Sequence, residues 1–112
     1  MRYALLINER PGAYDGLDEG ARAAITAEYV ALTTDDRIVG GERLQPADTA
    51  TTVRLADGEV LLTDGPFADT KEVFGGFYLV EASDLDSVLD LAGRVPALRL
   101  GGSVEVRPLA ER

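Results

Sequence analysis

The stretch from Asp64 to Glu72 holds the side chains of this sequence that are best suited to chemistry. Within these nine residues lie three carboxylates, Asp64, Asp69 and Glu72, and Lys71, the only lysine of the chain. Carboxylates that share a site with one cation change each other's proton affinity and can carry out acid–base catalysis without histidine. The sequence therefore predicts Asp64 as a catalytic proton-transfer residue, with Lys71 and Glu72 as substrate-binding candidates. A structural role is the more common alternative, because an aspartate before Gly65-Pro66 often accepts hydrogen bonds from turn amides.

Residue types that the chain lacks narrow the possible chemistry further. The 112 residues include no histidine, no cysteine and no tryptophan. This composition excludes disulfides, thiolate nucleophiles, imidazole bases and ordinary structural zinc sites. The sequence also has no glycine-rich nucleotide-binding motif, and we expect neither a metal nor a cofactor. Arg43 and Arg54 are the candidates for orienting an anionic substrate, since guanidinium groups bind carboxylates through paired hydrogen bonds.

The strong negative charge bears on the partners of the chain. Asp and Glu number 20 against 11 Lys and Arg, which gives a formal net charge of −9 at pH 7. Such a surface repels polyanions, so we expect no direct contact with nucleic acid or anionic membranes. The first residues do not resemble a signal peptide, and no apolar run approaches the roughly 20 residues of a membrane span. We expect a cytoplasmic protein that forms a single domain over residues 1–112.

Apolar spacing predicts strands and helices in alternation. Tyr3–Ile7 is a continuous apolar run typical of a buried strand. A helix is expected after Asp18, a good N-cap residue, because apolar residues recur every three or four positions up to Leu32. This helix should end before Gly40-Gly41. The remaining expected elements are a central strand at 77–81, a helix at 85–92 with Ser83 in its capping box, and a last strand at 104–107.

The most specific local signal is a β-hairpin around Asp57-Gly58. The runs 51–56 and 59–63 flank this pair, which is typical of a two-residue turn. In the register that this turn sets, Leu61 falls on a mostly polar face. The opposite face carries only apolar side chains, namely Val53, Leu55, Val60 and Leu62. A slip of one residue would mix the two faces, so the turn and the apolar pattern support the same register.

The order of these elements predicts an α+β fold of ferredoxin-like type. The order is strand, helix, two or three strands, helix and strand, and two helices can cover one face of a four- or five-stranded antiparallel sheet. The second face stays bare, and we expect Leu61, Tyr78 and Val80 among its apolar residues. Because large apolar patches are uncommon on monomers, we expect two such faces to pack together in a homodimer.

The motif segment also carries a resemblance to a known family. The run from Asp64-Gly65-Pro66-Phe67 through Glu72 to Gly75-Gly76 resembles the signature of the DGPF-motif branch of the YCII-like domains. Residues 1–7 and 104–108 extend the similarity over essentially the whole chain, as does the stretch 41–46. The resemblance implies a dimeric α+β sandwich and matches Asp64 to the aspartate of the motif. It also implies frequent occurrence beside, or fused to, sigma factors of the extracytoplasmic-function class.

The function that the resemblance implies is broad. Active sites in the wider family have been built around a histidine and an aspartate, and a relative is linked to dechlorination of a hydroxylated aromatic ring. This chain has no histidine, so only Asp64 carries over. We expect a dimer that binds a small organic molecule and, if it is an enzyme, a lyase or isomerase that needs only proton transfer. The alternative is a non-catalytic regulatory or protein-interaction domain, functionally linked to a sigma factor.

Overall fold

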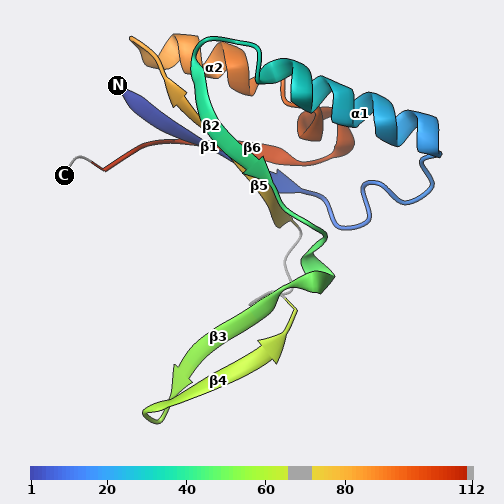
Figure 1. The fold of residues 1–112 in the computed structure, drawn as a ribbon, viewed down its shortest axis with the longest axis vertical. Coiled ribbons are helices and arrows are strands. Elements are labelled where there is room, and N and C mark those ends of the chain that lie inside the picture. Colours follow the sequence, from blue (N-terminus) through green and yellow to red (C-terminus); the bar gives the residue numbers. More distant parts are fainter. Residues whose placement is uncertain (66–71, 111–112) are drawn as a thin grey trace.

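The structure is a computed structural model that describes residues 1–65 and 72–110, and Figure 1 shows how its elements are arranged. In chain order, the elements are β1 (Arg2–Glu9), α1 (Glu19–Leu32), β2 (Ile38–Arg43), the 3₁₀ helix η1 (Ala47–Thr49), β3 (Thr51–Ala56), β4 (Glu59–Asp64), β5 (Val73–Glu81), α2 (Leu85–Ala92), the 3₁₀ helix η2 (Pro96–Leu100) and β6 (Ser103–Pro108).

Four of these strands form one antiparallel sheet in the order β2-β5-β1-β6. Both helices lie on the same face of this sheet (Figure 1). Taken along the chain, the sheet strands and helices follow the order β-α-β-β-α-β, with the first and third sheet strands in the centre. This is the ferredoxin-like arrangement. The predicted α+β fold is confirmed, and the sheet has four strands.

The hydrophobic core lies between the sheet and the two helices. Every second residue of β1 points into it, as the burial of Tyr3, Leu5 and Ile7 shows. The opposing layer comes from the apolar faces of the two helices. The other principal core residues are Ile25, Tyr29, Leu32, Tyr78, Val80, Val88 and Leu91.

The expectation that Tyr78 and Val80 lie on the bare face of the sheet is wrong. Val80 pairs with Tyr3 and Tyr78 pairs with Leu5, and directly opposed residues point to the same face of a sheet. Both side chains are therefore buried beneath the helices. Because β5 is apolar on both faces, its own sequence does not tell which face meets the helices. The face without helices, which we call the open sheet face, instead carries Ala4, Leu6, Phe77 and Leu79.

The helices begin at aspartate caps. The Asp18 carboxylate accepts a hydrogen bond from the Ala21 amide at 2.8 Å, as predicted for α1. For α2 the cap is Asp84, which accepts from the Ser87 amide at 2.8 Å, and not Ser83 as expected. Within the described residues, no helix is long and apolar enough to cross a membrane.

Strand β2 is an element that the sequence did not reveal. Its centre is Gly40-Gly41, which was expected to follow a helix end rather than to sit inside a strand. Gly41 has φ of +138°, and a β-carbon there would collide with the backbone oxygen of Phe77. The glycine therefore permits the close approach of β2 to β5.

The predicted hairpin forms, but it lies outside the four-stranded sheet. β3 and β4 pair with each other in the predicted register, from Ala56 opposite Glu59 to Thr51 opposite Asp64. We call residues 51–64 the arm, because they extend away from the sheet and helices (Figure 1). At the base of the arm, the Gly65 amide donates to the Ala50 oxygen at 2.6 Å. Leu61 therefore lies on the arm and not on the sheet.

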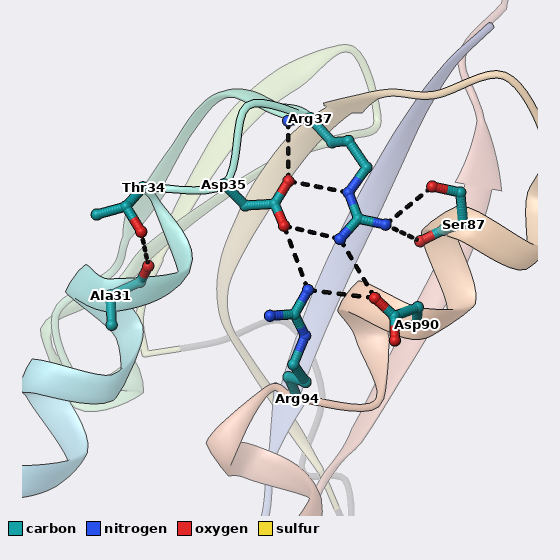
Figure 2. A network of polar contacts seen from close by, with 7 residues as sticks. All are labelled: Ala31, Thr34, Asp35, Arg37, Ser87, Asp90 and Arg94. Atoms are coloured by element: carbon teal, nitrogen blue, oxygen red, sulfur yellow. Dashed lines mark hydrogen bonds and ion pairs between the residues drawn. The ribbon is translucent and has the colours of Figure 1, made fainter.

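A polar network joins the α1–β2 connection to α2 (Figure 2). The Arg37 guanidinium donates to both carboxylate oxygens of Asp35, at 2.9 and 2.7 Å, and to the backbone and hydroxyl oxygens of Ser87. Asp90 and Arg94 complete the network through ion pairs at 3.2 Å. The hydrogen bonds from Arg37 hold the pKa of Asp35 well below its usual range.

Candidate functional site

Two neighbouring cavities open at the end of the sheet where β1 and β2 finish. The first, of about 300 Å³, lies between α1 and the strands β1, β2 and β5. The second, of about 540 Å³, is lined by the loop after β1, the segment around η1 and the start of β5. Glu9, Arg43 and Gly75 line both cavities. These three residues therefore form the wall at which the two cavities meet.

Glu9 ends β1 and places a carboxylate in this wall. Its Oε2 atom is buried and has no hydrogen-bond partner among the described residues. A bulge permits this position: Ile7 pairs with Gly76 and Asn8 with Phe74, which leaves Gly75 as the extra residue of β5. A β-carbon on Gly75 would overlap the Glu9 carboxylate, so the absence of a side chain there makes room for it.

Two phenols face the Glu9 carboxylate. Tyr14 comes from the loop after β1 and Tyr29 from the buried face of α1, and the hydroxyl oxygens of both are buried without a hydrogen-bond partner in the described structure. Burial raises the pKa of both phenols above the ordinary value. The adjacent Glu9 carboxylate raises the pKa of Tyr14 further, through its hydrogen-bonding interaction with the phenol and through its charge, and it raises that of Tyr29 through its charge. Both phenols therefore stay protonated at neutral pH and can donate hydrogen bonds.

Arg43, the last residue of β2, supplies the positive charge of the site. Its guanidinium carbon lies 5.4 Å from the centre of the Tyr14 ring and 5.6 Å from that of Tyr29, within cation–π range. The Nη1 atom donates to the Thr26 hydroxyl at 3.0 Å. In the described parts of the chain, Arg43 forms no ion pair. The two rings and Thr26 hold the guanidinium in place, and its charge remains available to an anion.

Among the site residues predicted from the sequence, Arg43 lies in the cavity wall. Asp64 is exposed at the base of the arm, opposite Thr51, and lines neither of these two cavities. Arg54 is also exposed on the arm. Glu72 precedes β5 and accepts a hydrogen bond from the Ser103 hydroxyl. Lys71 lies outside the described residues.

Sequence reasoning did not identify Glu9 or Tyr29 as site residues. A glutamate after an apolar strand is too common to attract attention, and Tyr29 does belong to the core through its ring. Tyr14 belongs to a loop with no periodic pattern to mark it, and the structure places it beside Glu9. The position of the Glu9 carboxylate beside Gly75 of β5 is visible only once the strand register and its bulge are known.

Comparison with known proteins places this chain in a family. A family model described as the YCII-related domain matches residues 1–111. An uncharacterised protein of Rhizobium meliloti (strain 1021), R00369, is 49% identical over 69 residues, which are 61% of this chain and 56% of that protein. This chain therefore aligns with little more than half the length of that relative.

A solved structure shares the fold. It is the 5-chloro-2-hydroxyhydroquinone dehydrochlorinase TftG from Burkholderia phenoliruptrix AC1100, in complex with 2,5-dihydroxybenzoquinone. The two chains superpose with a TM-score of 0.55 at 20% sequence identity, over 100% of this chain and 96% of that one. At this identity the likeness concerns the fold alone. Because the family model matches nearly its whole length, the chain belongs to the YCII-related domain family.

Proposed function

We propose that the chain binds a small organic anion at the wall formed by Glu9 and Arg43. The observation that carries this proposal is the gathering of three buried polar atoms around the Arg43 guanidinium; among residues 1–65 and 72–110 these atoms accept or donate no hydrogen bond and Arg43 forms no ion pair. These atoms are Glu9 Oε2 and the hydroxyls of Tyr14 and Tyr29. Buried polar groups normally have partners, and each one without a partner costs about 1–3 kcal/mol. A ligand with an acidic group for Arg43 and further oxygens for the phenols would supply those partners.

The same atoms suit a reaction that needs only proton transfer. Glu9 is placed to take a proton from a carbon next to a carbonyl group, and the electron pair of that bond would move onto the carbonyl oxygen. Arg43 and the protonated phenols would stabilise the resulting enolate. Return of the proton to another carbon is an isomerisation, and loss of a neighbouring leaving group is an elimination. This assigns the lyase or isomerase role to the carboxylate in the cavity wall.

Asp64 remains the second carboxylate to be tested. Its position at the base of the arm lies near η1, whose residues Ala47 and Asp48 line the larger cavity. Glu9→Gln and Asp64→Asn separate the two assignments, because each removes one negative charge with almost no change of shape. Loss of turnover in Glu9→Gln alone supports proton transfer by Glu9, whereas loss in Asp64→Asn alone assigns the proton transfer to the motif aspartate.

A thermal-shift screen tests the binding proposal directly. The panel consists of small carboxylates, enols, phenols and hydroxylated quinones, since the solved structure of similar fold holds a dihydroxybenzoquinone. A ligand that binds the folded state stabilises it by about 2.7 kcal/mol at 100 times its Kd. We expect at least one acidic compound to stabilise the wild type and to lose its effect in Arg43→Met. Arg2→Met, at the other end of β1 and outside both cavities, is the matched control. A panel without any stabilising compound would contradict the proposal.

A non-catalytic role is the second candidate. The specific observation in its favour is that the sequence contains no histidine, so the histidine–aspartate site that the family resemblance implies cannot form. A regulatory domain of this kind would form a homodimer and, as the family resemblance suggests, act with a sigma factor. Binding in the screen without turnover of the bound compound would favour this role, and turnover would exclude it.

A further inference from the structure

The smaller of the two cavities differs in character from the charged wall that it shares with the larger one. It lies between α1 and the sheet and is lined largely by apolar groups, with Ile7 of β1, Val30 of α1 and Tyr78 of β5 among them. The Tyr78 hydroxyl donates to the backbone oxygen of Tyr29 at 2.8 Å, so Tyr78 contributes its ring to the cavity without an unsatisfied polar group. The described structure thus holds an apolar space of about 300 Å³ next to the charged groups of the site.

Two glycines keep this space open. Gly41 of β2 pairs with Tyr78, and Gly76 of β5 pairs with Ile7, so both lie on the side of the sheet that faces α1. A β-carbon at either glycine would lie 2.8 Å or less from a backbone oxygen of the neighbouring strand. A larger residue therefore does not fit at these two positions unless a strand moves, and neither position contributes a side chain that would fill the cavity.

The volume of the cavity sets the size of the group that it can take. Protein interiors contain few voids larger than a water molecule, and an apolar cavity of about 150 Å³ is large enough to bind benzene. A cavity of about 300 Å³ therefore takes an apolar group about twice as large, such as a bicyclic ring or an alkyl chain of roughly ten carbon atoms. Each methylene group that leaves water for this space should raise the affinity about two- to fourfold.

The charges around the two cavities favour one orientation of such a ligand. The larger cavity alone is lined by four further charged side chains, namely Arg10, Asp15, Arg22 and Asp48. An apolar group placed there would remove charged groups from water, whereas beneath α1 it meets aliphatic and aromatic carbon. Glu42 also lines the smaller cavity, but it pairs with Phe77, so its side chain points to the open sheet face.

We propose that the ligand of this site is an acid with an apolar group of about six to twelve carbon atoms, which lies beneath α1 while the acidic group meets Arg43. This inference rests on the proposed binding of an anion at the wall and names the class of compound that binds. Arg43 lines both cavities, and its guanidinium carbon lies 5.6 Å from the centre of the Tyr29 ring, which lines the smaller one. The acidic group and the apolar group are therefore bound together, and the size of the apolar group distinguishes one acid from another.

Calorimetric titration with linear carboxylates from butanoate to decanoate tests the proposal. The six additional methylene groups should make decanoate bind to the wild type at least about 50-fold more tightly than butanoate. Val30→Trp places an indole at the rim of the cavity and should reduce this ratio to less than about fivefold. Because Val30 is 60% exposed, we expect this variant to fold, and circular dichroism checks it. Ala27→Trp is the matched control, since Ala27 is exposed on α1 and lines neither cavity, and it should keep the wild-type ratio.

Nuclear magnetic resonance locates the bound carbon chain without any substitution. The protein has three isoleucines, Ile7, Ile25 and Ile38, and of these Ile7 lines the smaller cavity. With methyl-labelled isoleucine, decanoate should give intermolecular nuclear Overhauser effects to Ile7. It should give none to Ile38, which lies at the start of β2 and lines neither cavity.

The outcomes separate this proposal from the binding of an anion itself. Equal affinity for butanoate and decanoate, weakened for both in Arg43→Met, would overturn the apolar group and keep the anion site. A ratio that stays unchanged in Val30→Trp, or the absence of an Overhauser effect to Ile7, would place the carbon chain on another surface, such as the apolar face of the arm, and would also overturn the proposal. If the wild type binds no carboxylate of the series, both the anion site and the apolar group are contradicted.

Discussion

Gly75 lies so close to the Glu9 carboxylate that a β-carbon on residue 75 would overlap it. The backbone of Gly75 does not have the positive φ that disfavours side chains, so alanine is compatible with the strand itself. Only the flexible Glu9 side chain has to move. Gly75→Ala is therefore expected to retain the fold and to lower the affinity for a ligand bound at the cavity wall by at least about tenfold.

The same substitution should lower the pKa of Tyr14, because the Glu9 charge contributes to raising it. At about pH 11, one unit above the ordinary tyrosine value, the wild-type Tyr14 should remain protonated, and a measurable fraction should ionise in Gly75→Ala. Nuclear magnetic resonance of ring-labelled tyrosine measures this fraction. Gly40→Ala is the control, since its β-carbon meets only Leu79, at an ordinary 3.6 Å. Equal protonation of Tyr14 in all three proteins would disprove the coupling to Glu9.

Acid should destabilise the protein in part through Asp35. Hydrogen bonds from Arg37 lower the pKa of Asp35 in the folded state, whereas in the unfolded chain it returns to about 3.9. The contribution of Asp35 to the free energy of unfolding is therefore fully present above about pH 5 and is lost as the pH falls below about 4. Urea unfolding across this range should show that the free energy of unfolding falls less steeply with decreasing pH in Asp35→Asn than in the wild type. The exposed neighbour Asp36 provides the control Asp36→Asn, which should follow the wild-type slope.

Adjacent leucines of β1 should respond very differently to truncation. Leu5 is 1% exposed under the helices, so Leu5→Ala should lower the free energy of unfolding by about 2–5 kcal/mol. Leu6 lies on the open sheet face, and Leu6→Ala should cost less than half as much. Urea unfolding of both variants at equal protein concentration makes the comparison. Equal losses would mean that the faces of β1 are assigned wrongly.

Local signals predicted much of this fold. The Asp57-Gly58 turn and the alternating residues around it were sufficient to predict the register of the arm. The Asp18 cap and the periodic apolar residues after it were sufficient to predict α1. Strand β2 was missed because Gly40-Gly41 resembles a break, whereas its glycines serve the close approach to β5. The faces of β5 were exchanged because Tyr78 and its neighbours are apolar on both sides. These two errors concern contacts between distant segments, which a local pattern does not contain.

The candidate site was predicted less well, for the same reason. Arg43 was chosen for its charge and its nearness in sequence to the Asp64 motif, yet the structure places it with Tyr14 and Tyr29, which are distant in sequence. Glu9 gave no local signal, since its environment depends on a bulge in a strand more than sixty residues away. A carboxylate site assembled from β1, α1, β2 and β5 can be recognised only from the folded chain.

Calorimetric titration of Arg43→Met measures whether an anion binds at the wall formed by Glu9 and Arg43. The titrant is the acidic compound that stabilises the wild type most in the thermal-shift screen. A charge-assisted hydrogen bond contributes about 1.5–3 kcal/mol, so we predict that Arg43→Met binds this compound about 10- to 100-fold more weakly than the wild type. Arg2→Met should bind it with wild-type affinity. Unchanged affinity in Arg43→Met, or an equal loss in both variants, would show that the anion does not bind at the wall formed by Glu9 and Arg43.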